Sequence, residues 1–87
     1  MKSFEDLFWQ LQQKKKAADP DSGTVARLAQ GPHEIGKKLV EEAGEVWMAA
    51  RYESRQQAAA EIAQLLYHTQ VMMLACDLSL EDVYNYL

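Results

Sequence analysis

The chain alternates between stretches with apolar residues every three or four positions and short breaks rich in turn-forming residues. The first stretch places apolar side chains on one side of a helix at Phe4, Leu7, Phe8 and Leu11. Ser3 precedes it, and Asp6 follows three residues later, a spacing typical of a helix start with a capping box. We expect this helix to end after Lys16, because residues 18–23 are dense in turn formers.

Two further helices are predicted in the middle of the chain. A short one covers residues 24–30 and stops at Gly31, since glycine is the usual residue after a helix end. The next begins at Pro32, whose missing N–H is tolerated in a first turn, and runs to about Tyr52. Its apolar stripe, expected to face the core, consists of Ile35, Leu39, Ala43, Val46 and Ala50.

The following helix is apolar on nearly all sides. It should start with a second capping box at Ser54 and Gln57 and reach about Cys76. One face carries Ile62, Leu66 and Met73, and the other carries Ala63, Tyr67, Val71 and Leu74. Such a helix must be buried all round, and 87 residues supply too few helices to wrap it. A last short helix should open at Ser79. We therefore predict one all-α domain over residues 1–87, a helical bundle completed by a partner subunit.

Composition narrows the partners and the location. The net charge of −4 disfavours nucleic acid, and the single basic run, Lys14–Lys16, is typical of a solvated helix end. No stretch is apolar enough to span a membrane, and the N-terminus does not resemble a signal peptide. Cys76 is the only cysteine, which excludes an internal disulfide and suits a reducing compartment. We expect a cytoplasmic protein.

Acidic and amide side chains recur at helical spacing on the two long helices. On the first they form a stripe with one lysine: Lys38, Glu41, Glu42 and Glu45. On the second they are Glu61 and Gln64, and His68 lies one turn beyond Gln64 on the same side. A solvated helix surface is one interpretation of this pattern. The other is a metal site, because oxygen ligands on two facing helices suit a hard cation such as Mg²⁺. Like charges at this spacing cost about 0.2–0.5 kcal/mol per pair, which a cation would offset.

Several other residues have both a structural and a functional interpretation. Ser22 and Thr24 either cap the short helix or present hydroxyls to a phosphate. His68 is either a core histidine or a substrate contact. Tyr67 is interpreted first as a packing residue, and Arg27 is a weaker candidate for a phosphate contact than Lys38.

The two acidic clusters carry a family resemblance. Glu42 and Glu45, followed by Glu61 and Gln64, resemble the Glu-x-x-Glu and Glu-x-x-Asp signature of the all-α nucleotide pyrophosphohydrolases, the MazG-type superfamily. Within it the chain is similar to the phosphoribosyl-ATP pyrophosphohydrolases of histidine biosynthesis. That similarity covers essentially the whole chain and rests on residues 22–31, 36–46, 65–68 and 78–83.

The resemblance implies Mg²⁺-dependent hydrolysis of the α–β phosphoanhydride of phosphoribosyl-ATP by a homodimer. It implies metal ligands at Glu42, Glu45, Glu61 and Gln64, and a carboxylate or the metal to activate water. Glu41 would be a ligand, a base or a partner of Lys38, and it joins Glu42, Glu45 and Glu61 as a catalytic candidate. Lys38 and Lys37, with Thr24, Ser22 and His68, are the candidates for substrate binding. Gln64 departs from the pattern, because an amide can coordinate Mg²⁺ but brings no charge.

Two rival functions are consistent with the same residues. The first is a housecleaning pyrophosphohydrolase that acts on free or damaged nucleoside triphosphates with the same chemistry. The second is a non-catalytic helical dimer that serves as an interaction module, for which Mg²⁺ would have no effect.

Overall fold

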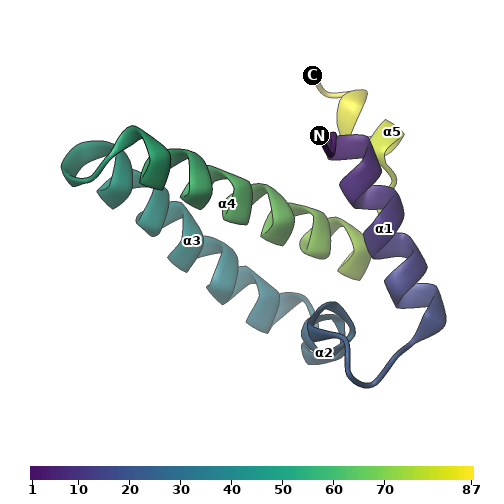
Figure 1. Cartoon of the computed structure of the whole chain (residues 1–87). Helices are drawn as coiled ribbons and strands as arrows, with labels where there is room; N and C mark the ends of the chain where they lie inside the picture. The colour runs from purple at the N-terminus through teal and green to yellow at the C-terminus, as the bar shows by residue number, and fades with distance from the viewer.

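The computed structural model describes all 87 residues and contains α-helices without any β-strand, which confirms the all-α prediction. In chain order the helices are α1 (Phe4–Ala17), α2 (Gly23–Gln30), α3 (Pro32–Tyr52), α4 (Arg55–Ala75) and α5 (Leu80–Tyr84). Helices α3 and α4 form a long antiparallel hairpin, and α1, α2 and α5 gather around its open end (Figure 1). No helix is long and apolar enough to cross a membrane.

Local signals in the sequence explain where the helices start. At α1 the Ser3 hydroxyl accepts from the Asp6 amide at 3.0 Å, and the Asp6 carboxylate accepts from the Ser3 amide at 3.1 Å. This predicted capping box is confirmed. At α4 the Ser54 hydroxyl accepts from the Gln57 amide as predicted, at 3.0 Å. The return bond is missing, because the Gln57 side chain donates to Glu61 instead, so the second capping box was only half right.

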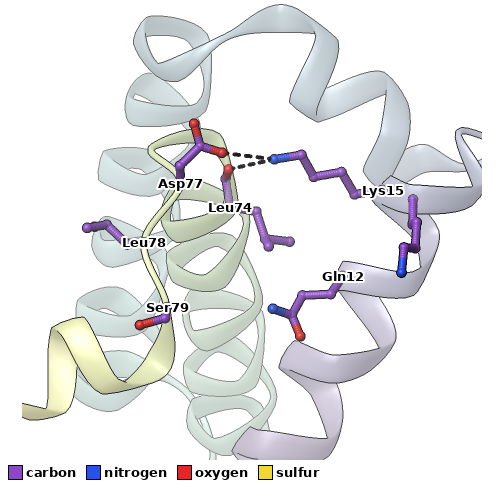
Figure 2. Close-up of a pocket in the computed structure, with 7 residues that line it drawn as sticks. Gln12, Lys15, Leu74, Asp77, Leu78 and Ser79 are labelled. Atoms are coloured by element: carbon purple, nitrogen blue, oxygen red, sulfur yellow. Dashed lines mark hydrogen bonds and ion pairs between the residues drawn. The ribbon is translucent and has the colours of Figure 1, made fainter.

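The helix ends are equally local. Gly31 ends α2 with φ +89°, a backbone conformation that favours glycine. After α4, Asp77 adopts a left-handed conformation with φ +56°, and the Leu78 amide donates back to the Met73 carbonyl at 2.8 Å. Figure 2 shows how Lys15 of α1 secures this end: its Nζ donates to the Leu74 carbonyl at 3.1 Å and lies 3.4 Å from the Asp77 carboxylate.

The core lies at the open end of the hairpin. Its buried apolar residues come from α1, α3 and α4: Phe8, Leu11, Ile35, Val71, Met73 and Leu74. Gln70 is fully buried beside them and donates from Nε2 to the Phe4 carbonyl at 2.8 Å. These contacts hold α1 across the C-terminal half of α4.

The opposite end of the hairpin packs only on itself. No residue of α4 before His68 is buried, and beyond Glu42 the only buried residue of α3 is Ala49. The predicted apolar stripe of α3 is therefore buried only in part: Ile35 is buried, Leu39 and Val46 are half-buried, and Ala43 and Ala50 are exposed. The reason is the rotation of α3, which turns Ile35, Glu42 and Ala49 toward the chain's interior and leaves the rest of the stripe uncovered.

Candidate active site

One turn of α3 gathers a lysine and two carboxylates. Because positions three and four residues apart lie on one helix side, Lys38 Nζ reaches Glu41 Oε1 at 3.5 Å and Glu42 Oε1 at 3.3 Å. The hydrogen bond from Glu42 and the charge of Glu41 raise the pKa of Lys38 above its ordinary value. Lys38 therefore stays cationic, and its half-buried side chain keeps the two carboxylates together.

His68 of α4 faces this group from across the hairpin. Its Nε2 lies 3.9 Å from Glu42 Oε1, and both side chains are nearly buried, at 3% and 11% exposure. Burial lowers the pKa of His68, and the Arg27 charge lowers it further, while the Glu42 charge acts in the opposite direction. The imidazole is therefore neutral near pH 7, so it can donate one hydrogen bond and accept another without adding charge to the site.

Next to His68, Tyr67 links α4 to α2. The Tyr67 hydroxyl lies 2.7 Å from the Thr24 hydroxyl, and its ring meets the His68 ring edge-on with centroids 4.9 Å apart. Ser22 caps α2, since its hydroxyl accepts from the Val25 amide at 3.3 Å. Ser22 and Thr24 also line a surface pocket of about 570 Å³ that includes Tyr67. Both hydroxyls thus combine a structural role with a place in this pocket.

The remaining candidates stand further apart in the single chain. Glu45 and Gln64 are exposed, and half-buried Glu61 accepts from the Gln57 side chain at 2.9 Å. No three acidic, histidine or cysteine side chains are close enough to hold a metal ion together. Lys37 is paired with Glu34 at 3.2 Å, away from the other site residues.

The donor chemistry of this group nevertheless fits a hard divalent cation. Glu42 presents a carboxylate that is largely withdrawn from water, and its ion-pair partners are Lys38 and a neutral His68. Lys38 occupies only part of the acceptor capacity of this carboxylate, and the remaining oxygen lone pairs suit a hard cation. Glu45, Glu61 and Gln64 offer further oxygen ligands on the same two helices.

Two residues gain importance only from the folded chain. Tyr67 was interpreted as a packing residue, yet its hydroxyl bonds Thr24, 43 positions away in the sequence. Lys14, interpreted as a solvated helix end, lines the same pocket as Arg27. The sequence carried no direct signal for either, because both assignments depend on how α1 and α2 meet α4.

The chain matches known proteins over its whole length. The family described as Phosphoribosyl-ATP pyrophosphohydrolase matches residues 1–87. A phosphoribosyl-ATP pyrophosphatase of Salinibacter ruber is 61% identical over 87 residues, covering 100% of both chains. Proteins of the same name from Streptomyces avermitilis and Streptomyces coelicolor are each 58% identical, over 99% of this chain and 97% of theirs. The chain therefore belongs to the phosphoribosyl-ATP pyrophosphohydrolase family.

Proposed function

We propose that this protein hydrolyses the α–β phosphoanhydride of phosphoribosyl-ATP, releasing pyrophosphate and phosphoribosyl-AMP, a step of histidine biosynthesis. The match to the family and to relatives of that name spans the whole chain and supports this reaction. The structural observation that carries it is the group formed by Lys38, Glu42 and His68 across the α3–α4 hairpin.

We propose Mg²⁺ as the cofactor, held by Glu42, Glu45, Glu61 and Gln64. A bound Mg²⁺ would neutralise phosphate charge and polarise the bond that breaks. The family membership and the oxygen-rich donor set support a divalent metal. Gln64 contributes a carbonyl oxygen where the family pattern has an Asp, so this site would carry one negative charge less.

The chain's own residues would bind the substrate and handle its proton. Lys38 is cationic and lies beside the proposed metal ligands, so we assign it to binding the substrate phosphates. Lys37, the preceding residue, would make a weaker phosphate contact because it is already paired with Glu34. His68, being neutral, would hydrogen-bond the substrate without repelling a cation. One carboxylate of this group would accept the proton of the attacking water. The candidates for that role are Glu41, Glu42, Glu45 and Glu61.

We also propose that the active protein is a homodimer formed through the α3–α4 hairpin. Large apolar side chains on these two helices are left uncovered by the single chain: Val40, Trp47, Met48, Ile62 and Leu66. Only 11 of 87 residues are buried, which is a small core for a domain that must fold alone. A cytoplasmic location is consistent with the lone, unpaired Cys76.

The reaction is tested by measuring pyrophosphate release from phosphoribosyl-ATP, ATP and other nucleoside triphosphates, each with and without Mg²⁺. We expect release from phosphoribosyl-ATP that requires Mg²⁺. Broad release from triphosphates would assign the protein to the housecleaning enzymes instead. No release from any substrate would contradict the proposal and favour a non-catalytic interaction module.

A further inference from the structure

Two neighbouring residues of α4 connect the pocket between α1, α2 and α4 to the carboxylate group of α3. Tyr67 lines the pocket, and its ring meets the His68 ring edge-on with the centroids 4.9 Å apart. His68 in turn lies 3.9 Å from Glu42. A ligand in this pocket would therefore be separated from the carboxylates only by the Tyr67–His68 pair.

Two basic residues in this pocket have no acidic partner. Lys14 and Arg27 both line it, and neither has a carboxylate oxygen within 4.0 Å. Arg27 is half-buried and close enough for its charge to act on His68. A half-buried guanidinium without a partner is costly unless an anion occupies the space in front of it.

The pocket also carries carboxylates and hydroxyls. Asp19 and Asp21 lie on its exposed side, where the Asp19 carboxylate accepts from the Asp21 amide at 2.9 Å. The Asp21 carboxylate has no ion-pair or hydrogen-bond partner. Basic groups bind phosphate oxygens, and carboxylates accept hydrogen bonds from the hydroxyls of a ribose. A pocket with both kinds of group, and a volume of about 570 Å³, is suited to a sugar phosphate rather than to a bare anion.

We propose that this pocket binds the phosphoribosyl end of the substrate, with Arg27 and Lys14 on its phosphate and Asp21 on its ribose hydroxyls. The assignment rests on the proposed function, because phosphoribosyl-ATP differs from ATP by this one group. The carboxylates of α3 and α4 would take the triphosphate end, and the pocket would take the other. Arg27 and Lys14 would thereby determine specificity for phosphoribosyl-ATP over free triphosphates.

The test compares charge-removing variants in the pocket with matched variants outside it. Arg27→Gln is paired with Arg51→Gln, and Lys14→Gln with Lys16→Gln, which lies two positions further along α1 and outside the pocket. Pyrophosphate release is measured with phosphoribosyl-ATP and with ATP at saturating Mg²⁺. Circular dichroism melting verifies that each variant is folded. Because Lys14 is exposed, Lys14→Gln still tests the pocket if the substitution of half-buried Arg27 disturbs folding.

We expect Arg27→Gln to raise KM for phosphoribosyl-ATP by roughly 10- to 100-fold, as for the loss of one charge-assisted contact, with a smaller change in kcat. Lys14→Gln should raise KM by a smaller factor. The two control variants should retain wild-type KM, and any turnover of ATP should be equal in all five proteins. An unchanged KM in folded Arg27→Gln would overturn the proposal. So would an equal loss with ATP, because the pocket would then bind the triphosphate end.

Direct binding separates this proposal from the reaction itself. Ribose 5-phosphate and inorganic phosphate are titrated into the wild-type protein and Arg27→Gln, and amide chemical shifts of residues 19–27 are followed by NMR. We expect ribose 5-phosphate to bind the wild-type protein more tightly than inorganic phosphate, and at least about tenfold more weakly to the variant. Failure of ribose 5-phosphate to bind these residues would refute the pocket assignment even if phosphoribosyl-ATP were hydrolysed. Binding without hydrolysis would refute only the reaction.

Discussion

Glu42 of α3 lies 3.9 Å from His68 of α4, measured from Oε1 to Nε2. This is the only contact at ion-pair distance between the two long helices. Both side chains are nearly buried, and the pKa of His68 is lowered, chiefly by burial. The contact therefore joins an anion to a neutral ring and contributes little as a salt bridge. Its interest is functional, because it places a carboxylate between a cationic Lys38 and a neutral hydrogen-bonding group.

Replacing Glu42 by Gln should abolish most turnover while preserving the fold. The amide has the same shape, and Lys38 keeps Glu41 as a partner at 3.5 Å, so the melting temperature should change little. Losing the carboxylate should lower kcat/KM by about 100-fold or more, a typical effect of removing a group that stabilises transition-state charge. Glu53→Gln, an exposed change directly after the same helix, is the control. Wild-type turnover in Glu42→Gln would contradict the proposed metal site.

Gln64 offers a test in the opposite direction. Changing it to Asp adds the charge that the family pattern has at this position, and Mg²⁺ affinity increases with the number of charged ligands. We expect Gln64→Asp to lower the Mg²⁺ concentration needed for half-maximal activity. Gln56→Asp places the same charge on an exposed position of α4 and should leave that concentration unchanged. Identical Mg²⁺ dependence in both variants would show that residue 64 is not a ligand.

A charge on the uncovered face of the hairpin should dissociate the homodimer. Ile62 is 46% exposed in the single chain, and burying an Asp there against a second copy would be costly. By light scattering, the wild-type protein should have twice the mass of one chain, and Ile62→Asp should have the mass of one chain. Gln13→Asp, on exposed α1, should remain dimeric. A wild-type monomer would show that the apolar face has another purpose.

Two helix ends invite stabilising substitutions. Ala18 and Asp77 both have positive φ, at 52° and 56°, a conformation that costs a residue with a Cβ about 1–2 kcal/mol. Glycine avoids this cost, but it lowers the free energy of unfolding by about 0.4–1 kcal/mol because it increases the conformational entropy of the unfolded chain. Urea unfolding should therefore show Ala18→Gly to be more stable by about 0.5–1 kcal/mol.

The gain from Asp77→Gly should be smaller than that from Ala18→Gly. Asp tolerates the left-handed conformation better than Ala, and the change also removes the contact of Asp77 with Lys15 at 3.4 Å. A larger gain at position 77 than at position 18 would contradict this account of the two helix ends.

The terminal helix should make stability depend on pH through Glu5 and Tyr84. Tyr84 donates to the Glu5 carboxylate at 2.5 Å, and this hydrogen bond lowers the pKa of Glu5 below its ordinary value of 4.5. A lowered pKa in the folded state stabilises the fold above 4.5 and loses that effect as the pH falls through the folded pKa. Tyr84→Phe should therefore destabilise the protein clearly at neutral pH and less at about pH 3.

The measurement for Tyr84 is urea unfolding at both pH values. Tyr86→Phe serves as the control, since Tyr86 is 93% exposed and its hydroxyl makes no hydrogen bond. An equal effect of Tyr84→Phe at both pH values would show that the bond to Glu5 does not act through the charge of its carboxylate.

The helices and their ends were largely predictable because they depend on neighbouring residues. Ser3 and Ser79 each cap a helix together with an acidic residue three positions later, and Gly31 and Pro32 divide α2 from α3 at the expected place. The Gln57 side chain was the exception. Its side chain can either accept from the Ser54 N–H or donate to the Glu61 carboxylate one turn on, and it donates to Glu61.

The sequence by itself also determined the chemistry of the candidate site, because spacing along one helix decides which side chains share a side. Lys38, Glu41 and Glu42 meet as their spacing predicts. Only the tertiary structure decided which residues of α3 face the interior and that His68 faces Glu42. It also decided that Arg27, Lys14 and Tyr67 share a pocket. The physical reason is that helix rotation and crossing are set by packing among residues far apart in the chain, which no local pattern encodes.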